Sequence, residues 1–156
     1  MIPKFFDGVT HLSDARFAAA QGFEYICLNL DPQNEGISLS EAQEILGWIS
    51  GPLLVGSFGN NPSAVVQDAV QLLSLDAVIA DHVPEGVASF QVTKEGNLLS
   101  PEGILFREFE GDSEHVREWV QAENVEGIIL HSTSEEKVGL RDFNDLIELL
   151  EELEGI

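Results

Sequence analysis

The stretch KFFDGVTHLSDARFAAAQGFEYICLNL, residues 4–30, contains two short apolar runs separated by a segment with helical spacing. The runs at 4–9 and 24–30 are rich in aromatic and β-branched residues, which is typical of buried strands. Between them, residues 13–22 place alanines and a phenylalanine at helical spacing, and Gly22 provides a helix end. A strand, a helix and a second strand in this order predict a βαβ unit.

The same alternation continues along the chain. Strands are predicted at 53–59, 76–81, 90–94, 103–109 and 126–132, and helices at 38–49, 61–73, 113–122 and 142–153. Ser38 and Glu41 have the spacing of a capping box, and Ser13 and Asn61 are the predicted N-caps of their helices. Trp48 and Trp119 fall on helix faces, which predicts packing rather than ligand stacking. Short apolar strands alternating with amphipathic helices predict an α/β fold with a parallel sheet and helices outside it.

The composition excludes several classes of partner. The chain has 156 residues, with 28 acidic and 7 basic side chains, so its formal net charge is −21 at pH 7. This charge opposes binding to nucleic acid and to anionic membranes, and we expect neither.

Cys27 is the only cysteine, so a disulfide within the chain is excluded, as suits a reducing compartment. No apolar run approaches the ~20 residues of a membrane span, and residues 1–8 lack the features of a signal peptide, so we expect a cytoplasmic protein.

Two blocks of the sequence resemble phosphoribosylanthranilate isomerase, a (β/α)₈ barrel enzyme of tryptophan biosynthesis. FFDGVTHLSDARFAAAQGFEYICLNLDP is similar to the family's opening, LLVGSFGNNPSAV to its third strand and helix, and LDAVIADH to its fourth strand. The second block, about 104–154, resembles the family's last two units. Only residues 83–103 remain where the family has its fifth and sixth units. The resemblance therefore implies a single domain over 1–156, a TIM-barrel-like fold shortened to about seven strands and remodelled around residues 83–103.

The resemblance also identifies a candidate catalytic base. The family's Amadori rearrangement uses a cysteine after strand 1 as general base and an aspartate after strand 6 as general acid, and Asp7 stands at the cysteine position. A carboxylate can abstract a proton, although an aspartate before glycine is also a common turn residue. The family's acid and its substrate-binding arginine after strand 2 have no counterpart. At the end of strand 4, Ile79 and Asp81 replace the family's glutamine and histidine, and His82 follows.

The phosphate site is the weakest match to the family. In this fold, phosphate binds to backbone N–H groups of glycine-rich turns after strands 7 and 8. Here these turns are acidic, with Glu108, Glu110, Asp112, Glu135 and Glu136. A phosphate dianion near these carboxylates would cost several kcal/mol at an effective dielectric constant of about 20. The groups that remain as candidate phosphate or substrate ligands are Gly111, Ser132, Thr133 and Ser134 as hydrogen-bond donors, and Arg107 and Lys137 as cations.

Strand ends of a parallel barrel share one face, so we expect Asp7, Asn29, Asp31, Asp81, His82 and His131 to converge there. Three functions are compatible with these residues. The first is a barrel that has lost the parent isomerase activity and acts as a binding or interaction protein. The second is an active Amadori-type isomerase or other small-molecule enzyme. In this enzyme Asp7 is the base, and His82 or His131 is its catalytic partner. The substrate-binding residues are then Asn29, Asp31, Asp81 and Arg107. The third is a divalent metal site, but no short metal-binding motif supports it, so the prediction includes no metal and no cofactor.

Loss of a unit from a barrel leaves a seam in its wall. The apolar residues between the two blocks have no crossover helix to cover them: Val83, Val87, Phe90, Val92, Leu98 and Leu99. Residues 90–99 are expected either to form a hairpin across the gap or to pair with the same segment of a second chain. We therefore expect a homodimer.

Overall fold

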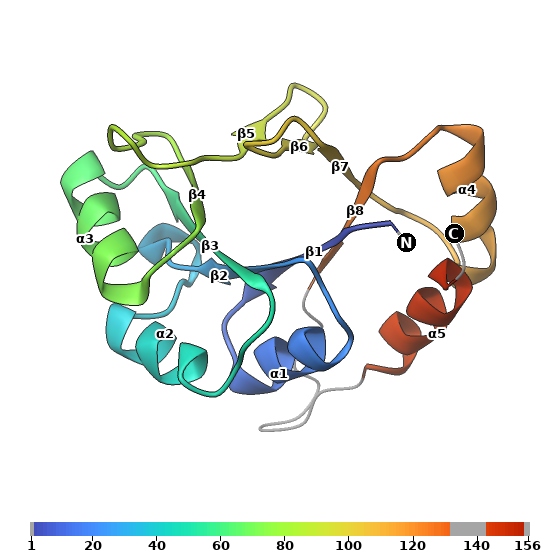
Figure 1. Cartoon of the computed structure of the whole chain (residues 1–156), viewed down its shortest axis with the longest axis horizontal. Coiled ribbons are helices and arrows are strands. Elements are labelled where there is room, and N and C mark those ends of the chain that lie inside the picture. Colours follow the sequence, from blue (N-terminus) through green and yellow to red (C-terminus); the bar gives the residue numbers. More distant parts are fainter. Residues whose placement is uncertain (1, 132–142, 155–156) are drawn as a thin grey trace.

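The computed structural model describes residues 2–131 and 143–154. Within them, six parallel strands pair in the order β4-β3-β2-β1-β8-β7. Their bounds are Lys4–Val9 (β1), Tyr25–Asn29 (β2), Leu53–Gly59 (β3), Ala77–Ala80 (β4), Leu105–Glu108 (β7) and Gly127–His131 (β8). The helices lie outside this curved sheet (Figure 1), with bounds Leu12–Ala20 (α1), Leu39–Leu46 (α2), Ser63–Leu73 (α3), Val116–Ala122 (α4) and Asn144–Leu153 (α5). No helix in the described part of the chain has the length and apolar character to cross a membrane.

A short hairpin completes the barrel wall. Its strands, β5 (Gln91–Val92) and β6 (Leu98–Leu99), are antiparallel, and β6 pairs with β7. On the other side, the Val78 N–H donates to the Ala88 carbonyl at 3.0 Å, and the Phe90 N–H donates to the Val78 carbonyl at 2.9 Å. The segment from Ala88 to Leu99 therefore joins both edges of the parallel sheet. Figure 1 shows no helix over β5 and β6, so the ring of helices is interrupted there.

The shortened, remodelled barrel predicted from the sequence is confirmed. The hairpin provides β6 in addition to the expected strands, which brings the sheet to eight strands. Of the two arrangements expected for residues 90–99, the structure has the hairpin within one chain. The homodimer stays a prediction. Because the hairpin fills the gap in the barrel wall, a second chain is not needed there.

Aromatic side chains fill the inside of the barrel. Phe5, Tyr25, Phe90 and Phe106 are buried together, with every pair of their ring centroids between 5.0 and 6.1 Å apart. The rest of this interior cluster is Cys27, Val55, Ala77, Leu98 and Ile129. Strand residues of the opposite orientation, such as Phe6 and Ile26, pack against the surrounding helices. A solid interior leaves only the ends of the barrel for ligands.

The helix starts agree only partly with the prediction. The capping box is confirmed, because the Glu41 N–H donates to Ser38 Oγ at 3.1 Å and the Ser38 N–H donates to Glu41 Oε1 at 3.3 Å. Ser13 is not an N-cap, since α1 begins at Leu12. Asn61 is not one either, because its amide donates to the Phe58 carbonyl and α3 begins two residues later. Trp48 does not pack: it lies beyond the end of α2 and is 66% exposed.

Candidate functional site at the barrel mouth

Polar side chains form the last layer of the barrel interior. Along each strand, side chains alternate between the two faces of the sheet, so residues two positions beyond a buried interior residue also face inward. Asp7 follows Phe5 in this way, Glu108 follows Phe106, and His131 follows Ile129. These three strands are neighbours, in the order β1-β8-β7. The topology therefore gathers two carboxylates and an imidazole at the mouth of the barrel, at the C-terminal ends of the strands.

His131 lies between the two carboxylates. It is the register partner of Asp7, and its Nδ1 is 3.6 Å from Asp7 Oδ2. Its Nε2 is 2.5 Å from Glu108 Oε1. All three side chains are partly exposed to solvent. The imidazole thus has a hydrogen-bonded carboxylate at Nε2 and a second carboxylate near Nδ1, an arrangement that suits proton transfer in acid–base chemistry.

A thiol lies beneath this cluster. Cys27 is fully buried in β2, and its pKa is raised well above its ordinary value by burial, then by the charge of Asp7 and a hydrogen bond with that carboxylate. The thiol therefore stays protonated and is excluded as a nucleophile or a base at neutral pH. It serves instead as a neutral neighbour of Asp7, a role that the sequence analysis missed.

The other half of the mouth is a cleft of about 560 Å³ between β2, β3, β4 and the hairpin. One set of lining residues is polar: Asp31, Asn34, Ser57, Asp81, Ser89 and Gln91. The other is mainly apolar and includes Ile79, Val83, Phe90 and Val92. Val83 and Val92 are 39% and 61% exposed, so the cleft offers apolar surface to a ligand as well as hydrogen-bonding groups. This mixture is typical of small-molecule sites.

The loop after β2 is built around Asp31. This carboxylate is 6% exposed and accepts hydrogen bonds from the Gln33 N–H at 3.0 Å and the Asn34 side-chain amide at 2.9 Å. Asn29 accepts from the Asp31 N–H at 3.1 Å and donates to the Asn34 carbonyl at 2.9 Å. A Cβ atom added at Gly59 would lie 2.7 Å from Asp31 Cγ, so only glycine fits beside the buried carboxylate. Asn29 and Asp31 thus use much of their hydrogen-bonding capacity to shape one wall of the cleft.

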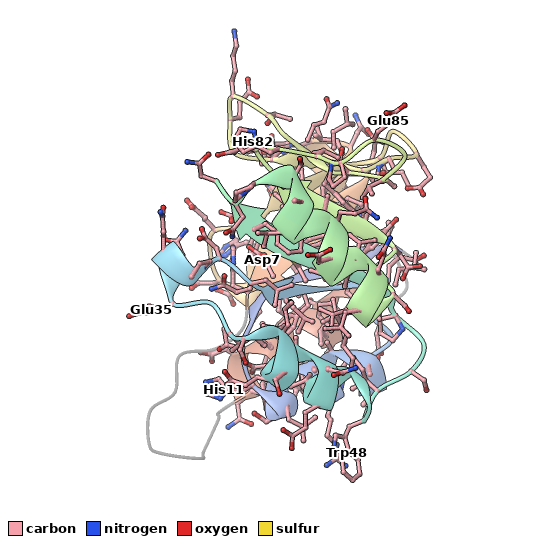
Figure 2. All side chains as sticks on the ribbon, turned by 90° about the vertical axis from the view of Figure 1, so that its left-hand side faces the viewer. Asp7, His11, Glu35, Trp48, His82 and Glu85 are labelled. Atoms are coloured by element: carbon pink, nitrogen blue, oxygen red, sulfur yellow. The ribbon has the colours of Figure 1, made fainter. Side chains whose placement is uncertain are left out.

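The remaining predicted site residues divide into three groups. Asp81 lines the cleft, as expected of a substrate-binding residue. His82 is exposed, with its Nε2 3.1 Å from Asn60 Oδ1, and Figure 2 shows it well apart from Asp7, so His131 and not His82 lies beside the candidate base. Ser132, Thr133 and Ser134 lie outside the residues that the structure describes.

Arg107 is a correction to the predicted site. It follows Phe106 by one position and therefore points out of the barrel. Its guanidinium is 2.9 Å from Glu123 Oε1 and 5.4 Å from the centre of the Trp119 ring. The side chain is thus held against α4 and does not serve the mouth.

Among the described residues, the candidate ligands of the alternative metal site do not form a compact set. Within residues 2–131 and 143–154, the group of potential ligands close enough to share an ion is Asp112, Glu114 and His115, all exposed on the turn before α4. None of these three residues lines the cleft or belongs to the His131 cluster. Such exposed acidic groups are common without a metal.

Comparison with known proteins bears on the fold alone. No protein-family model matches the chain, and no curated protein does so either. Among solved structures, phosphoribosylanthranilate isomerase in complex with reduced 1-(o-carboxyphenylamino)-1-deoxyribulose 5-phosphate matches with a TM-score of 0.77 and 17% identity over 100% of both chains.

Two further solved structures agree. Monomers generated from the dimeric phosphoribosylanthranilate isomerase of Thermotoga maritima match with a TM-score of 0.74 and 18% identity, over 100% of both chains. The Thermus thermophilus enzyme matches with a TM-score of 0.72 and 18% identity, over 98% of each chain. The chain therefore shares the (β/α) barrel fold of these isomerases. One fold carries many chemistries, so the activity has to be argued from the site.

Proposed function

We propose that this protein binds an unphosphorylated small molecule at the barrel mouth and does not isomerise phosphoribosylanthranilate. The observation that carries the proposal is the charge of the mouth. Asp7 and Glu108 lie in one half, Asp31 and Asp81 line the other, and within the described residues neither the His131 cluster nor the cleft includes a lysine or arginine. A phosphate charge about 6 Å from one carboxylate is repelled by about 3 kcal/mol at an effective dielectric constant of about 20. A neutral or cationic ligand avoids this cost.

The comparison with the resembling family supports the same proposal. The family's acid belongs to its sixth strand, and here the β5–β6 hairpin occupies the region of the fifth and sixth units. Of the two candidate cations at the family's phosphate turns, Arg107 is engaged outside the barrel, and Lys137 lies outside the residues that the structure describes. Loss of a general acid or base alone typically costs about 10²–10⁴-fold in rate. The parent reaction would lack the acid and the phosphate anchor together.

The test is an assay for the parent reaction together with a comparison of two sugars. The purified protein is expected to leave phosphoribosylanthranilate unchanged and to fail to complement a tryptophan auxotroph that lacks the isomerase. At low salt, ribose 5-phosphate is expected to raise the melting temperature no more than ribose does. Complementation of the auxotroph, or stabilisation that requires the phosphate group, would refute the proposal.

A second candidate function is an acid–base enzyme that acts on such an unphosphorylated ligand. The contact between His131 Nδ1 and Asp7 Oδ2 favours it, because a base and a proton carrier lie side by side at the mouth. The test substrate is N-ribosylanthranilate, the aminoaldose without its phosphate, and its conversion is followed by chromatography. Asp7→Asn is expected to abolish turnover without lowering the melting temperature. Glu126→Gln, which removes a carboxylate at the opposite end of β8, is the control and is expected to retain turnover. Unchanged turnover in the Asp7→Asn variant would remove Asp7 from the mechanism.

We propose further that the protein is a cytoplasmic homodimer. A single buried cysteine supports a reducing compartment, and the exposed Val83 and Val92 support self-association near the hairpin. The high negative charge opposes association, so the contact has to be apolar. Light scattering over a range of concentrations is expected to give twice the chain mass of 17.0 kDa. A strict monomer at every concentration would contradict the dimer and leave the rest of the proposed function intact.

A further inference from the structure

A second groove lies outside the barrel mouth, between α4 and the turn that follows β7. It has a volume of about 440 Å³, and the rings of Phe109 and Trp119 line it with their centroids 5.1 Å apart. The other lining residues are Glu110, Gly111, Asp112, His115, Glu118 and Ala122. The groove therefore has two aromatic rings in its wall and three carboxylates around them. It shares no lining residue with the cleft at the mouth.

The surroundings of Trp119 already show which chemical group this surface accepts. The guanidinium of Arg107 lies over the Trp119 ring, 5.4 Å from its centre, and pairs with Glu123 at 2.9 Å. This is a cation on an aromatic face with a carboxylate beside it. Arg107 is not among the residues that line the groove, so the aromatic surface facing the groove is open to a second cation.

The charge of the groove favours a cationic ligand. The side chain of Asp112 is 82% exposed, and the only basic group in the lining is His115, whose Nδ1 is 4.0 Å from Asp112 Oδ2. A single exposed carboxylate contributes little to binding. Three carboxylates around an aromatic pair attract a cation and also fix its position over the rings.

We propose that this groove binds a basic segment of a partner protein, with an arginine or lysine side chain on the Phe109–Trp119 pair and its neighbours paired with Glu110, Asp112 and Glu118. The groove is open: six of its lining residues are exposed, and both aromatic residues are half-buried. Such a surface covers too little of a small molecule, since small-molecule sites bury most of their ligand. An extended peptide can instead contact the rings and the carboxylates along its length. Trp119 then has a binding role in addition to its packing against Phe109.

The two tryptophans of the chain allow a direct test. Trp48→Phe removes the exposed tryptophan and leaves Trp119 as the only fluorescent indole. This variant is titrated with an acetylated, amidated oligo-arginine peptide and with its oligo-citrulline analogue, which keeps the shape without the charge. We expect saturable quenching of Trp119 by the arginine peptide, weakened by salt, and none by the citrulline peptide.

Two sets of substitutions distinguish the groove from general attraction by an acidic protein. In the Trp48→Phe background, Glu110→Gln, Asp112→Asn and Glu118→Gln together are expected to weaken binding by about tenfold or more. The matched control removes the same number of charges elsewhere, by Glu44→Gln, Asp68→Asn and Glu95→Gln, and is expected to change the affinity by less than about twofold. Phe109→Leu, checked for folding by circular dichroism, is expected to weaken binding through loss of the ring.

Three results would overturn the proposal. Equal weakening by the groove and control sets would show that the peptide responds only to net charge. Absence of Trp119 quenching by the arginine peptide would show that the rings are not part of a binding surface. Binding of methylguanidinium as tight as that of the peptide would assign the groove to a small cation rather than to a protein segment.

Discussion

Phe90→Ala tests whether the hairpin is part of the barrel. Phe90 is 3% exposed, and its ring centroid lies 5.1 Å from that of Phe5, 5.0 Å from that of Tyr25 and 6.1 Å from that of Phe106. Its N–H also joins the hairpin segment to β4 through the Val78 carbonyl. Because the side chain fills the centre of a closely packed aromatic cluster, truncation to alanine leaves a cavity that the surrounding rings cannot fill. Such Phe→Ala changes cost about 3–5 kcal/mol.

The assay is equilibrium unfolding in urea. With a slope of about 2 kcal/mol per molar urea, the midpoint is expected to fall by about 1.5–2.5 M. Lys94→Ala is the matched control on the same hairpin: its side chain is exposed in the turn, and the expected change is within about 0.5 kcal/mol. A loss in Phe90→Ala of less than about 1 kcal/mol would mean that the hairpin lies on the barrel without being packed into it. The closed wall, and with it the cleft that the hairpin borders, would then be refuted.

Two further predictions concern the mouth wall and the barrel interior. Gly59→Ala is expected to lower the free energy of unfolding by more than about 2 kcal/mol, because Gly59 has a φ of +57° and a Cβ would press on Asp31. Gly96→Ala is the control: Gly96 has a φ of +83° but open space around it, so the loss is only the backbone strain of about 1 kcal/mol. The difference between the two variants in urea unfolding measures the contact with Asp31. Burial, followed by the charge of Glu102 and a hydrogen bond with it, raises the pKa of Tyr25 to about 12. The folded protein therefore keeps a proton that the unfolded chain loses near pH 10, so this contribution to stability is complete below pH 10 and falls as the pH rises towards 12. Tyr25 is the only tyrosine, so its phenolate absorbance reports the titration directly, and an unshifted curve, or no lowering of the pKa by Glu102→Gln, would contradict this account.

The periodicity of the sequence predicts most of the architecture because the signals are local. The βα units around β1, β2 and β3 follow from apolar runs and helical spacing, and the capping box at Ser38 fixes the start of α2. The strand β6 is different. It contains two residues and is held by pairing with its neighbours rather than by its own composition, so the sequence offers the hairpin only as one of two arrangements for residues 90–99.

The candidate site was predictable in part. The convergence of Asp7 and His131 follows from parallel strands sharing one edge, and the register between β1 and β8 bears this out. Arg107 was assigned to the wrong environment, and the contact of Glu108 with His131 was missed, although the signal was present. Once Phe106 is recognised as an interior residue, strand alternation places Glu108 inside and Arg107 outside. What alternation cannot provide is distance, such as the close contact between Glu108 and His131.

The position of the chain ends has a consequence for how this barrel can be cut and rejoined. Lys4 and Glu154 line the same small cavity, so the described segments nearest the two ends of the chain lie side by side. A short linker between them would close the polypeptide into a ring. New ends opened in the exposed hairpin turn at 94–96 would then start the chain at β6 and finish it at β5, with every strand of the parallel sheet left intact. Such a circular permutant is expected to fold.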